Sequence, residues 1–308
     1  MTTTPLAGAN TAPAPGPTVL GWFEPGTPDW HAARAAGIGG SEIAAVLGLS
    51  PHESRFSLWH RKKGLIGPVE ESPQMRWGKK HEPTICDEFA ELHAGWKIRP
   101  SPTYASVERP WHIVNPDRLL LDDFGDIAAI LEAKTSRDAE GWGEPGSDDI
   151  PIHYRTQCLW YLDVLGVDRC HVAVLIAGCE YREYEIWADD AEASLMREAG
   201  AEFMRTLAEN ERPDIDGHSA TYQAIRELPD GLDDVDVEIP TALRDRWHAA
   251  QDAAWVAEDE LITCKGLLLD HIGTGRRAVC ENARVATRTV RDGSTYQLMP
   301  ARTRRNAA

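Results

Sequence analysis

The sequence predicts an α/β fold in which helices flank a small mixed central sheet, followed by a long C-terminal helix with short strands. Helical and strand-like patterns alternate over residues 19–213, residues 126–135 have the apolar run of a buried strand, and residues 241–271 repeat apolar side chains in heptads. The 308 residues, 42% hydrophobic and 26% charged, exclude a mainly disordered or fibrous chain.

Composition divides the chain into four segments. Residues 1–18 lack the basic and apolar parts of a signal peptide, so we expect a disordered leader. Residues 19–213 are the predicted core domain, residues 214–240 an acidic linker, and residues 241–308 a long helix plus short strands of unassigned role. No apolar run reaches 18 residues, and the six cysteines are scattered, which favours free thiols in a reducing cytoplasm.

The core elements follow from capping residues and apolar spacing. Asp29, Ser41 and Ser54 are candidate N-caps of the first three helices, and the Gly37–Gly40 run separates the first two. The predicted helices span residues 30–36, 42–47, 55–63, 74–93, 151–165 and 191–209, and the predicted strands span residues 104–107, 113–114, 126–135, 171–176 and 184–187.

Residues 241–271 predict one helix of about 45 Å, at about 1.5 Å per residue. Its apolar side chains recur in alternating steps of four and three, which is the seam of a helix pair. The seam packs on its own chain, which is the simplest expectation, or on another subunit. The seam residues are Leu243, Trp247, Ala250, Ala254, Ala257, Leu261, Cys264 and Leu268.

The formal charge of −17 argues at first sight against a nucleic-acid partner, because nonspecific binding needs basic surface. The charge is uneven, however. Residues 214–260 have 13 acidic and 3 basic side chains, whereas residues 261–308 have 9 basic and 3 acidic ones. Residues 55–80 have 7 basic and 2 acidic side chains, so the sequence predicts a local basic path within an acidic core.

The most informative pattern is Asn115-Pro116-Asp117, followed after 14 residues by Glu132-Ala133-Lys134. Glu132 and Lys134 point the same way because side chains alternate along a strand, and buried charges of this kind need compensation. A magnesium ion bound by Asp117, Glu132 and the Ala133 carbonyl would supply it, with Lys134 serving the attacking water or the phosphate. In isolation this spacing is more often a surface salt-bridge cluster.

Flanking residues add to the pattern. Glu82, on the predicted helix 74–93, brings a third carboxylate to the site or is a solvated helix carboxylate. Gln157 and Tyr161 lie four residues apart on one helix face, where Gln157 can bond a phosphate or a metal-bound water. For Tyr161, packing in the core is the equal alternative.

Five pieces follow one another over residues 29–187: DWHAARAAGIGGSEIAAVLGLSP, MRWGKKHEP, NPDRLL, ILEAKTS and QCLWYLDVLG. In this order they resemble the YqaJ-like viral recombinase / lambda exonuclease family of the PD-(D/E)XK nuclease superfamily. The resemblance implies a magnesium-dependent exonuclease, with manganese as a possible substitute, that degrades the 5′-ended strand of linear duplex DNA. It also implies 3′ single strands for a phage single-strand annealing protein, a ring-shaped homo-oligomer, and the cytoplasm of a bacterial host.

The resemblance also implies roles for individual residues. Arg34 and Ser41 match the family's arginine and serine that hold the 5′-terminal phosphate, which suits a guanidinium fork and a hydroxyl; an exposed helix arginine is the alternative. Asn115 and Arg118 depart from the family's serine and glycine, so the turn and phosphate contact there are not implied. The remaining implied site residues are Asp117 and Glu132 as metal ligands and Lys134, Glu82 and Gln157 as catalytic residues, with Tyr161 and Asn115 in supporting roles.

Two other functions stay open. One is another PD-(D/E)XK DNA endonuclease or repair nuclease, which would nick a supercoiled circle. The other is a non-catalytic DNA-end-binding assembly protein, which would bind DNA without magnesium-dependent loss of substrate.

Overall fold

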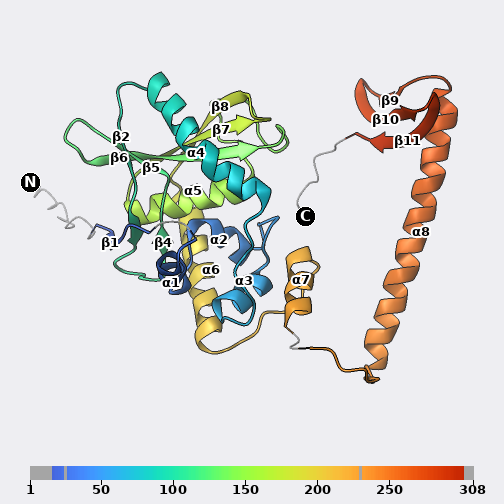
Figure 1. Ribbon diagram of the computed structural model, residues 1–308, viewed down its shortest axis with the longest axis horizontal. Coiled ribbons are helices and arrows are strands. Elements are labelled where there is room, and N and C mark those ends of the chain that lie inside the picture. The colour runs from blue at the N-terminus through green and yellow to red at the C-terminus, as the bar shows by residue number, and fades with distance from the viewer. Residues whose placement is uncertain (1–15, 24–25, 229–230, 302–308) are drawn as a thin grey trace, which may run out of the picture. The chain divides into compact units, whose positions relative to one another are not determined.

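The computed structural model describes residues 16–23, 26–228 and 231–301. The chain divides into two compact units, Met1–Asp230 and Gly231–Ala308, each described by itself (Figure 1). The first unit is built on a five-stranded mixed sheet with helices against it. The predicted α/β fold with a small mixed central sheet is therefore confirmed.

The central sheet has the strand order β2-β5-β6-β7-β8. The β6–β7 pair is parallel and every other neighbouring pair is antiparallel. A crossover containing helix α5 (Ile152–Leu165) joins the parallel pair, as a parallel connection requires. The strands are β2 (Lys97–Pro100), β5 (Arg118–Leu121), β6 (Ile127–Ser136), β7 (Arg169–Ile176) and β8 (Glu180–Trp187).

Strand β6 is the middle strand, as its apolar run predicts. Ile130 and Leu131 are fully buried, but they enter different cores because side chains alternate between the faces of a strand. Ile130 packs with residues of α5, whereas Leu131 packs with residues of helix α4 (Pro73–Leu92). The same alternation places Glu132 and Lys134 on the α5 face.

Helix α4 covers the other face of the sheet through its C-terminal half, where Ile85 and Phe89 are buried (Figure 1). Ser72 caps the helix and Pro73 occupies its first position, which proline tolerates because no helical N–H is lost there. Helical spacing places Trp77 on the same face as Ile85 and Phe89, yet its side chain is 57% exposed. The N-terminal half of α4 therefore faces away from the core.

Two of the three predicted caps differ from the observed ones. Thr27, not Asp29, caps α1, because the helix begins at Pro28 and the Thr27 hydroxyl accepts a hydrogen bond from Trp30 N. Gly39 precedes α2, so Ser41 lies inside the helix; Ser54 caps α3 as predicted. The three helices are α1 (Pro28–Ala35), α2 (Gly40–Val46) and α3 (Arg55–Lys62). A further helix of the first unit, α6, spans Asp190–Ala208.

A second, three-stranded sheet has the order β1-β3-β4. The predicted leader falls outside the described residues up to residue 15, and Thr18 already belongs to β1. The predicted strands at 104–107 and 113–114 correspond to the other two members. The strands are β1 (Thr18–Gly21), β3 (Thr103–Ala105) and β4 (Ile113–Val114).

Helix α7 (Ser219–Glu227) differs from the predicted linker over 214–240. Its Ala224 packs with Phe56 and Ile66, and its Thr221 hydroxyl donates to Ser54 Oγ at 2.7 Å. The first unit therefore extends beyond residue 213 and ends at Asp230. The sequence pattern does not predict this short helix, because acidic and turn-forming residues surround its few apolar positions.

The second unit holds α8 (Thr241–Ile272) and an antiparallel sheet of order β11-β10-β9. These elements agree with the predicted long helix and short strands. Only the last turns of α8 pack on the sheet, and no residue of α8 is buried. Within the described residues, no helix is both long and apolar enough to cross a membrane. The strands are β9 (Arg277–Cys280), β10 (Ala283–Arg291) and β11 (Ser294–Pro300).

Candidate functional site

The backbone at the start of β5 and the middle of β6 brings Asp117 and Glu132 together. Asp117 immediately precedes β5, and the next residue, Arg118, pairs with Leu131 of β6. Ala133 N donates to Asp117 Oδ2 at 2.8 Å, and Asp117 N lies 3.4 Å from Glu132 Oε2. Two carboxylates separated by fourteen residues in the chain are thus fixed by one antiparallel strand pair.

Lys134 and Gln157 complete a hydrogen-bonded group around Glu132. Lys134 Nζ donates to Glu132 Oε1 at 2.6 Å and to Gln157 Oε1 at 3.2 Å. Gln157 Nε2 donates to Glu132 Oε1 at 2.6 Å and to the Tyr161 hydroxyl at 2.8 Å. Lys134 Nζ also lies 4.9 Å from the centre of the Tyr154 ring, a cation–π contact that the sequence did not single out.

Burial and charge set the electrostatics of this group. Burial raises the pKa of Asp117, and the Glu132 carboxylate raises it further, so this pKa lies well above its usual value despite the Lys134 charge. Burial lowers the pKa of Lys134, but the carboxylates of Glu132 and Asp117 outweigh burial and hold the pKa above its usual value. The site therefore favours the protonated form of Lys134. Its two carboxylates, when ionised, carry more negative charge than this one ammonium balances.

Glu82 lies beside this group but its carboxylate has another partner. Arg118 Nη1 donates to Glu82 Oε1 at 2.9 Å and to the Asp117 carbonyl at 2.7 Å. The guanidinium thus stands between Glu82 and the backbone at Asp117. The role of Glu82 as a third metal-site carboxylate stays a prediction, and Arg118 is a neighbour whose function the sequence pattern did not reveal.

The donor set fits one hard divalent cation. Asp117 and Glu132 offer carboxylate oxygens, the ligand type that Mg²⁺ prefers, and a cation between them would offset the burial and the neighbouring negative charge that raise the pKa of Asp117. Among the described residues, no three or more His, Cys, Asp and Glu side chains lie together in a way that could hold a metal ion. The coordination shell then needs other oxygens, and the Ala133 carbonyl stays the predicted third donor.

Arg34 and Ser41 meet, although they come from different helices. Arg34 Nη2 donates to Ser41 Oγ at 2.7 Å and lies 3.5 Å from Glu42 Oε1. Lys62 Nζ donates to Glu42 Oε2 at 2.8 Å and to the Arg34 carbonyl at 2.7 Å. Glu42 and Lys62 are residues whose part in this group the sequence pattern did not reveal, and their ion pair fixes the backbone from which Arg34 projects.

Gly39 and Gly40 join the Arg34 group to helix α5. A β-carbon at Gly39 would lie 2.8 Å from Arg34 Nη2, and one at Gly40 would lie 2.3 Å from Tyr161 Cε1. Glycine at both positions allows the start of α2 to approach the guanidinium on one side and the phenol ring on the other. Because Tyr161 contacts Gln157, the Arg34 and Glu132 groups are linked through packed side chains.

Asn115 lies apart from the carboxylates. Its Nδ2 is 3.3 Å from the Ser101 carbonyl and 3.4 Å from the Pro102 carbonyl, so it ties two loops together. The structure thus gives Asn115 a structural contact, and its supporting role in catalysis stays a prediction.

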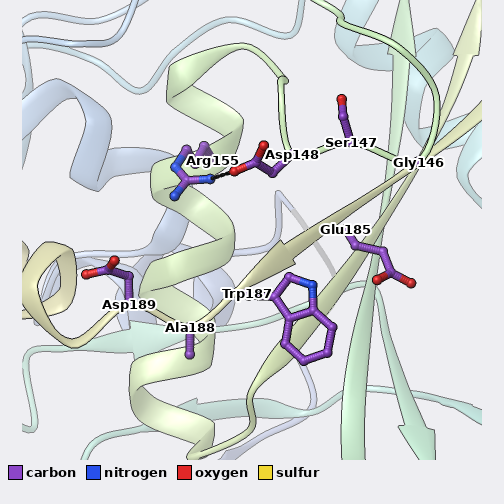
Figure 2. A pocket seen from close by; sticks show the side chains of 8 residues that line it. All are labelled: Gly146, Ser147, Asp148, Arg155, Glu185, Trp187, Ala188 and Asp189. Atoms are coloured by element: carbon purple, nitrogen blue, oxygen red, sulfur yellow. Dashed lines mark hydrogen bonds and ion pairs between the residues drawn. The ribbon is translucent and has the colours of Figure 1, made fainter.

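A polar pocket of about 360 Å³ is separate from these groups, and none of the predicted site residues lines it (Figure 2). Arg155 extends along its wall and is held by Asp148 at 3.1 Å and by Glu192 at 3.0 Å. The guanidinium is thus ion-paired with two neighbouring carboxylates. The lining residues are Gly146, Ser147, Asp148, Arg155, Glu185, Trp187, Ala188 and Asp189.

Part of the chain resembles curated proteins. The chain is 32% identical over 206 residues to the uncharacterized protein YqaJ of Bacillus subtilis, over 64% of this chain and 62% of YqaJ. It is 30% identical over 111 residues to protein D345L of African swine fever virus (strain Badajoz 1971 Vero-adapted), over 34% of this chain and 31% of D345L. The chain thus spans less than two thirds of the length of these curated relatives.

Solved structures also resemble the chain at low identity. The alkaline exonuclease LHK-Exo from Laribacter hongkongensis superposes with a TM-score of 0.48 at 18% identity, over 60% of this chain and 94% of LHK-Exo. A phage related exonuclease from Haemophilus somnus 129PT has a TM-score of 0.42 at 10% identity, over 57% of this chain and 96% of that structure.

The family match covers both groups of candidate residues. Residues 29–168 match the YqaJ-like viral recombinase domain, a range that includes Arg34 and Ser41 as well as Asp117, Glu132 and Gln157. The resemblance seen in the sequence is thereby confirmed. Over this range, which is less than half of the chain, the sequence is similar to the YqaJ-like viral recombinase family, of which YqaJ of Bacillus subtilis is a relative.

Proposed function

We propose that this protein is a metal-dependent deoxyribonuclease that degrades the 5′-ended strand of linear duplex DNA. The group of Asp117, Glu132, Lys134 and Gln157 is the observation that supports the proposal. It concentrates buried charge in the middle of the central strand β6, within the region that matches the viral recombinase domain. Such a concentration costs folding free energy, and function is the simplest reason to retain it.

Hydrolysis of a phosphodiester needs a positioned water and stabilisation of negative charge that develops on the phosphoryl oxygens. Bound at Asp117 and Glu132, Mg²⁺ (or Mn²⁺ in its place) would supply Lewis-acid charge and lower the pKa of water. Lys134, as an ammonium, donates hydrogen bonds and offers positive charge toward the reacting phosphate. Gln157 holds Glu132 with one end of its amide and Lys134 with the other, so it orients both.

Arg34 and Ser41 form the proposed pocket for the 5′-terminal phosphate. The guanidinium and the hydroxyl are already hydrogen-bonded to each other, so a phosphate would meet both donors without a large rearrangement. The packed path from Gly39 to Tyr161 fixes this pocket relative to Glu132. That arrangement favours cleavage at a 5′ end.

Ion pairs within the first unit leave less basic surface near this site than composition predicts. Within residues 55–80, Arg61, Lys62 and Lys79 form ion pairs with carboxylates of the same unit. Exposed Arg76 and Lys80 on the N-terminal half of α4 remain along the approach to Glu82. We propose that duplex DNA is bound through this limited surface and that affinity falls as salt rises.

The biological role extends the same proposal. Removal of the 5′-ended strand would leave 3′ single strands for a phage single-strand annealing protein. A closed ring of nuclease units around DNA would make the reaction processive. The cytoplasm of a bacterial host is the proposed setting.

The deciding experiment uses end-labelled linear duplex DNA with Mg²⁺, with matched 5′-phosphate and 5′-hydroxyl ends. We expect release of nucleotides from the 5′-phosphorylated end, and a loss of about a hundredfold or more in Lys134→Ala, because a charged donor to the reacting group is removed. Lys97→Ala is the matched control, because Lys97 is 59% exposed on the edge strand β2. Arg34→Ala should reduce the preference for 5′-phosphate over 5′-hydroxyl.

The same assay separates the other functions. Nicking of a supercoiled circle would indicate an endonuclease, and DNA binding without magnesium-dependent loss of substrate would indicate an assembly protein. Equal nucleotide release by wild type and Lys134→Ala would contradict the proposal.

A further inference from the structure

The N-terminal two thirds of α8 present an uncovered apolar seam. Leu243 is 52% exposed, Trp247 61% and Leu261 54%. Packing of the helix on the β9–β11 sheet is confined to Leu268, Leu269 and Ile272. Along the rest of α8, within the described part of the second unit, the heptad stripe has no cover. A helix with such a stripe is stable when a second helix buries it.

Side-chain sizes along the seam suit an antiparallel copy of the same helix. If two α8 helices cross with Asp252 at the centre, each seam residue faces the seam residue equally far on the other side of residue 252, and the flanking residues pair across the seam with an offset of two. Leu243 then faces Leu261, and the bulky Trp247 faces the small Ala257. Ala250 faces Ala254 at the centre, where small side chains allow the backbones to approach closely. In a parallel pair Trp247 would meet Trp247, next to layers made only of alanine.

The charges beside the seam complement each other in the same arrangement. Arg244 and Arg246 precede the centre, and Glu258 and Glu260 follow it. Antiparallel pairing brings the basic end of one helix over the acidic end of the other, with Arg246 against Glu260 and Arg244 against Glu258. Among the described residues of the single chain, Arg244 bonds only its exposed neighbour Asp245, a surface contact that contributes little to stability.

The two uses of α8 do not compete for the same residues. An antiparallel pair centred on Asp252 overlaps over residues 241–263, about 34 Å at about 1.5 Å per residue. The turns that pack on β9–β11 begin after this overlap, at Leu268. The helix thus has one segment for its own sheet and one for a partner.

We propose that α8 pairs with α8 of a second copy of this chain in an antiparallel coiled coil centred on Asp252. The partner is the same protein, because the size pattern and the charge pattern are both self-complementary about that residue. The contact is independent of the nuclease proposal and joins chains whatever the first unit does.

The first experiment measures the mass of the full-length chain by size exclusion with light scattering at micromolar concentrations. We expect an even number of 34.1 kDa chains, and a halved mass in Leu261→Glu. The substitution removes two symmetric leucine layers and should weaken pairing by about a hundredfold or more. Val256→Glu is the matched control, because Val256 is 70% exposed on the outer face of the helix and should leave the mass unchanged. A wild-type monomer, or an unchanged mass in Leu261→Glu with helicity retained, would overturn the proposal.

The second experiment tests orientation. Arg246→Glu places two glutamates together in the antiparallel pair and should weaken it by about tenfold, and adding Glu260→Arg should restore it. In a parallel pair position 260 faces Lys265 instead, so the double variant would stay weak. Parallel helices would also place Cys264 against Cys264 and give a disulfide-linked dimer on mild oxidation. Failure of the double variant to recover, or efficient Cys264 cross-linking, would refute the antiparallel arrangement.

Discussion

Replacement of Asp117 by asparagine should stabilise the metal-free protein while it abolishes metal-dependent activity. Asp117 is a half-buried carboxylate next to the buried Glu132, and the single ammonium in this group, that of Lys134, is bonded to Glu132. Asparagine retains an oxygen that accepts the hydrogen bond from Ala133 N, so the backbone contact survives. Removal of the charge leaves one carboxylate and one ammonium in place of two carboxylates and one ammonium.

The expected gain is about 1–3 kcal/mol in the free energy of unfolding at pH 7, the range seen when an imperfectly compensated buried charge is neutralised. The sign follows from the raised pKa of Asp117. A carboxyl that binds its proton more tightly in the folded state destabilises that state when ionised, so the gain is present at neutral pH and shrinks as pH falls.

The assay is urea unfolding in the presence of a chelator, repeated with Mg²⁺ or Mn²⁺. Wild type should gain stability from metal, by about 2.7 kcal/mol at one hundred times its dissociation constant, and Asp117→Asn should gain little. Asp123→Asn, in the turn between β5 and β6, is the control; its side chain is 97% exposed and the change should stay within about 0.5 kcal/mol. The reasoning is refuted if Asp117→Asn is less stable than wild type without metal, or if metal stabilises both equally.

Two further predictions follow from packing and from buried histidines. Gly40→Ala should cost about 1–3 kcal/mol and lower kcat about tenfold, because its methyl group would meet the buried Tyr161 ring; Gly78→Ala, whose methyl group would meet only Thr135 Oγ1 at 3.6 Å, should gain about 1 kcal/mol. Urea unfolding and steady-state nuclease rates check this, and equal effects of the two changes would contradict it. Stability should also fall below about pH 6.5, by about 1 kcal/mol per buried histidine at pH 5.5, because burial lowers each folded pKa and the unfolded chain then takes up more protons. Urea midpoints at pH 7.0 and 5.5 measure this, and equal midpoints would rule it out. The histidines are the buried His112, with a pKa of about 3, and the buried His171 and half-buried His153, each with a pKa of about 4.

Features that repeat along one element could be read from the sequence. Alternation along a strand predicted that Glu132 and Lys134 share one face of that strand. Helical spacing predicted that Gln157 and Tyr161 share one face of a helix. The apolar run before Glu132 identified the central strand, and the heptads identified α8. These properties depend on neighbours a few residues away, so the sequence by itself determined them.

Contacts between distant segments were decided only by the tertiary structure. Arg118 takes the Glu82 carboxylate, and Gly40 admits the Tyr161 ring, because β5 lies near α4 and α2 packs on α5. Helix α7 joins the first unit because Phe56 offers it an apolar surface. No periodicity encodes such pairings. Each depends on which surfaces meet once the sheet and its helices have packed, and the free energy of those contacts exists only in the folded chain.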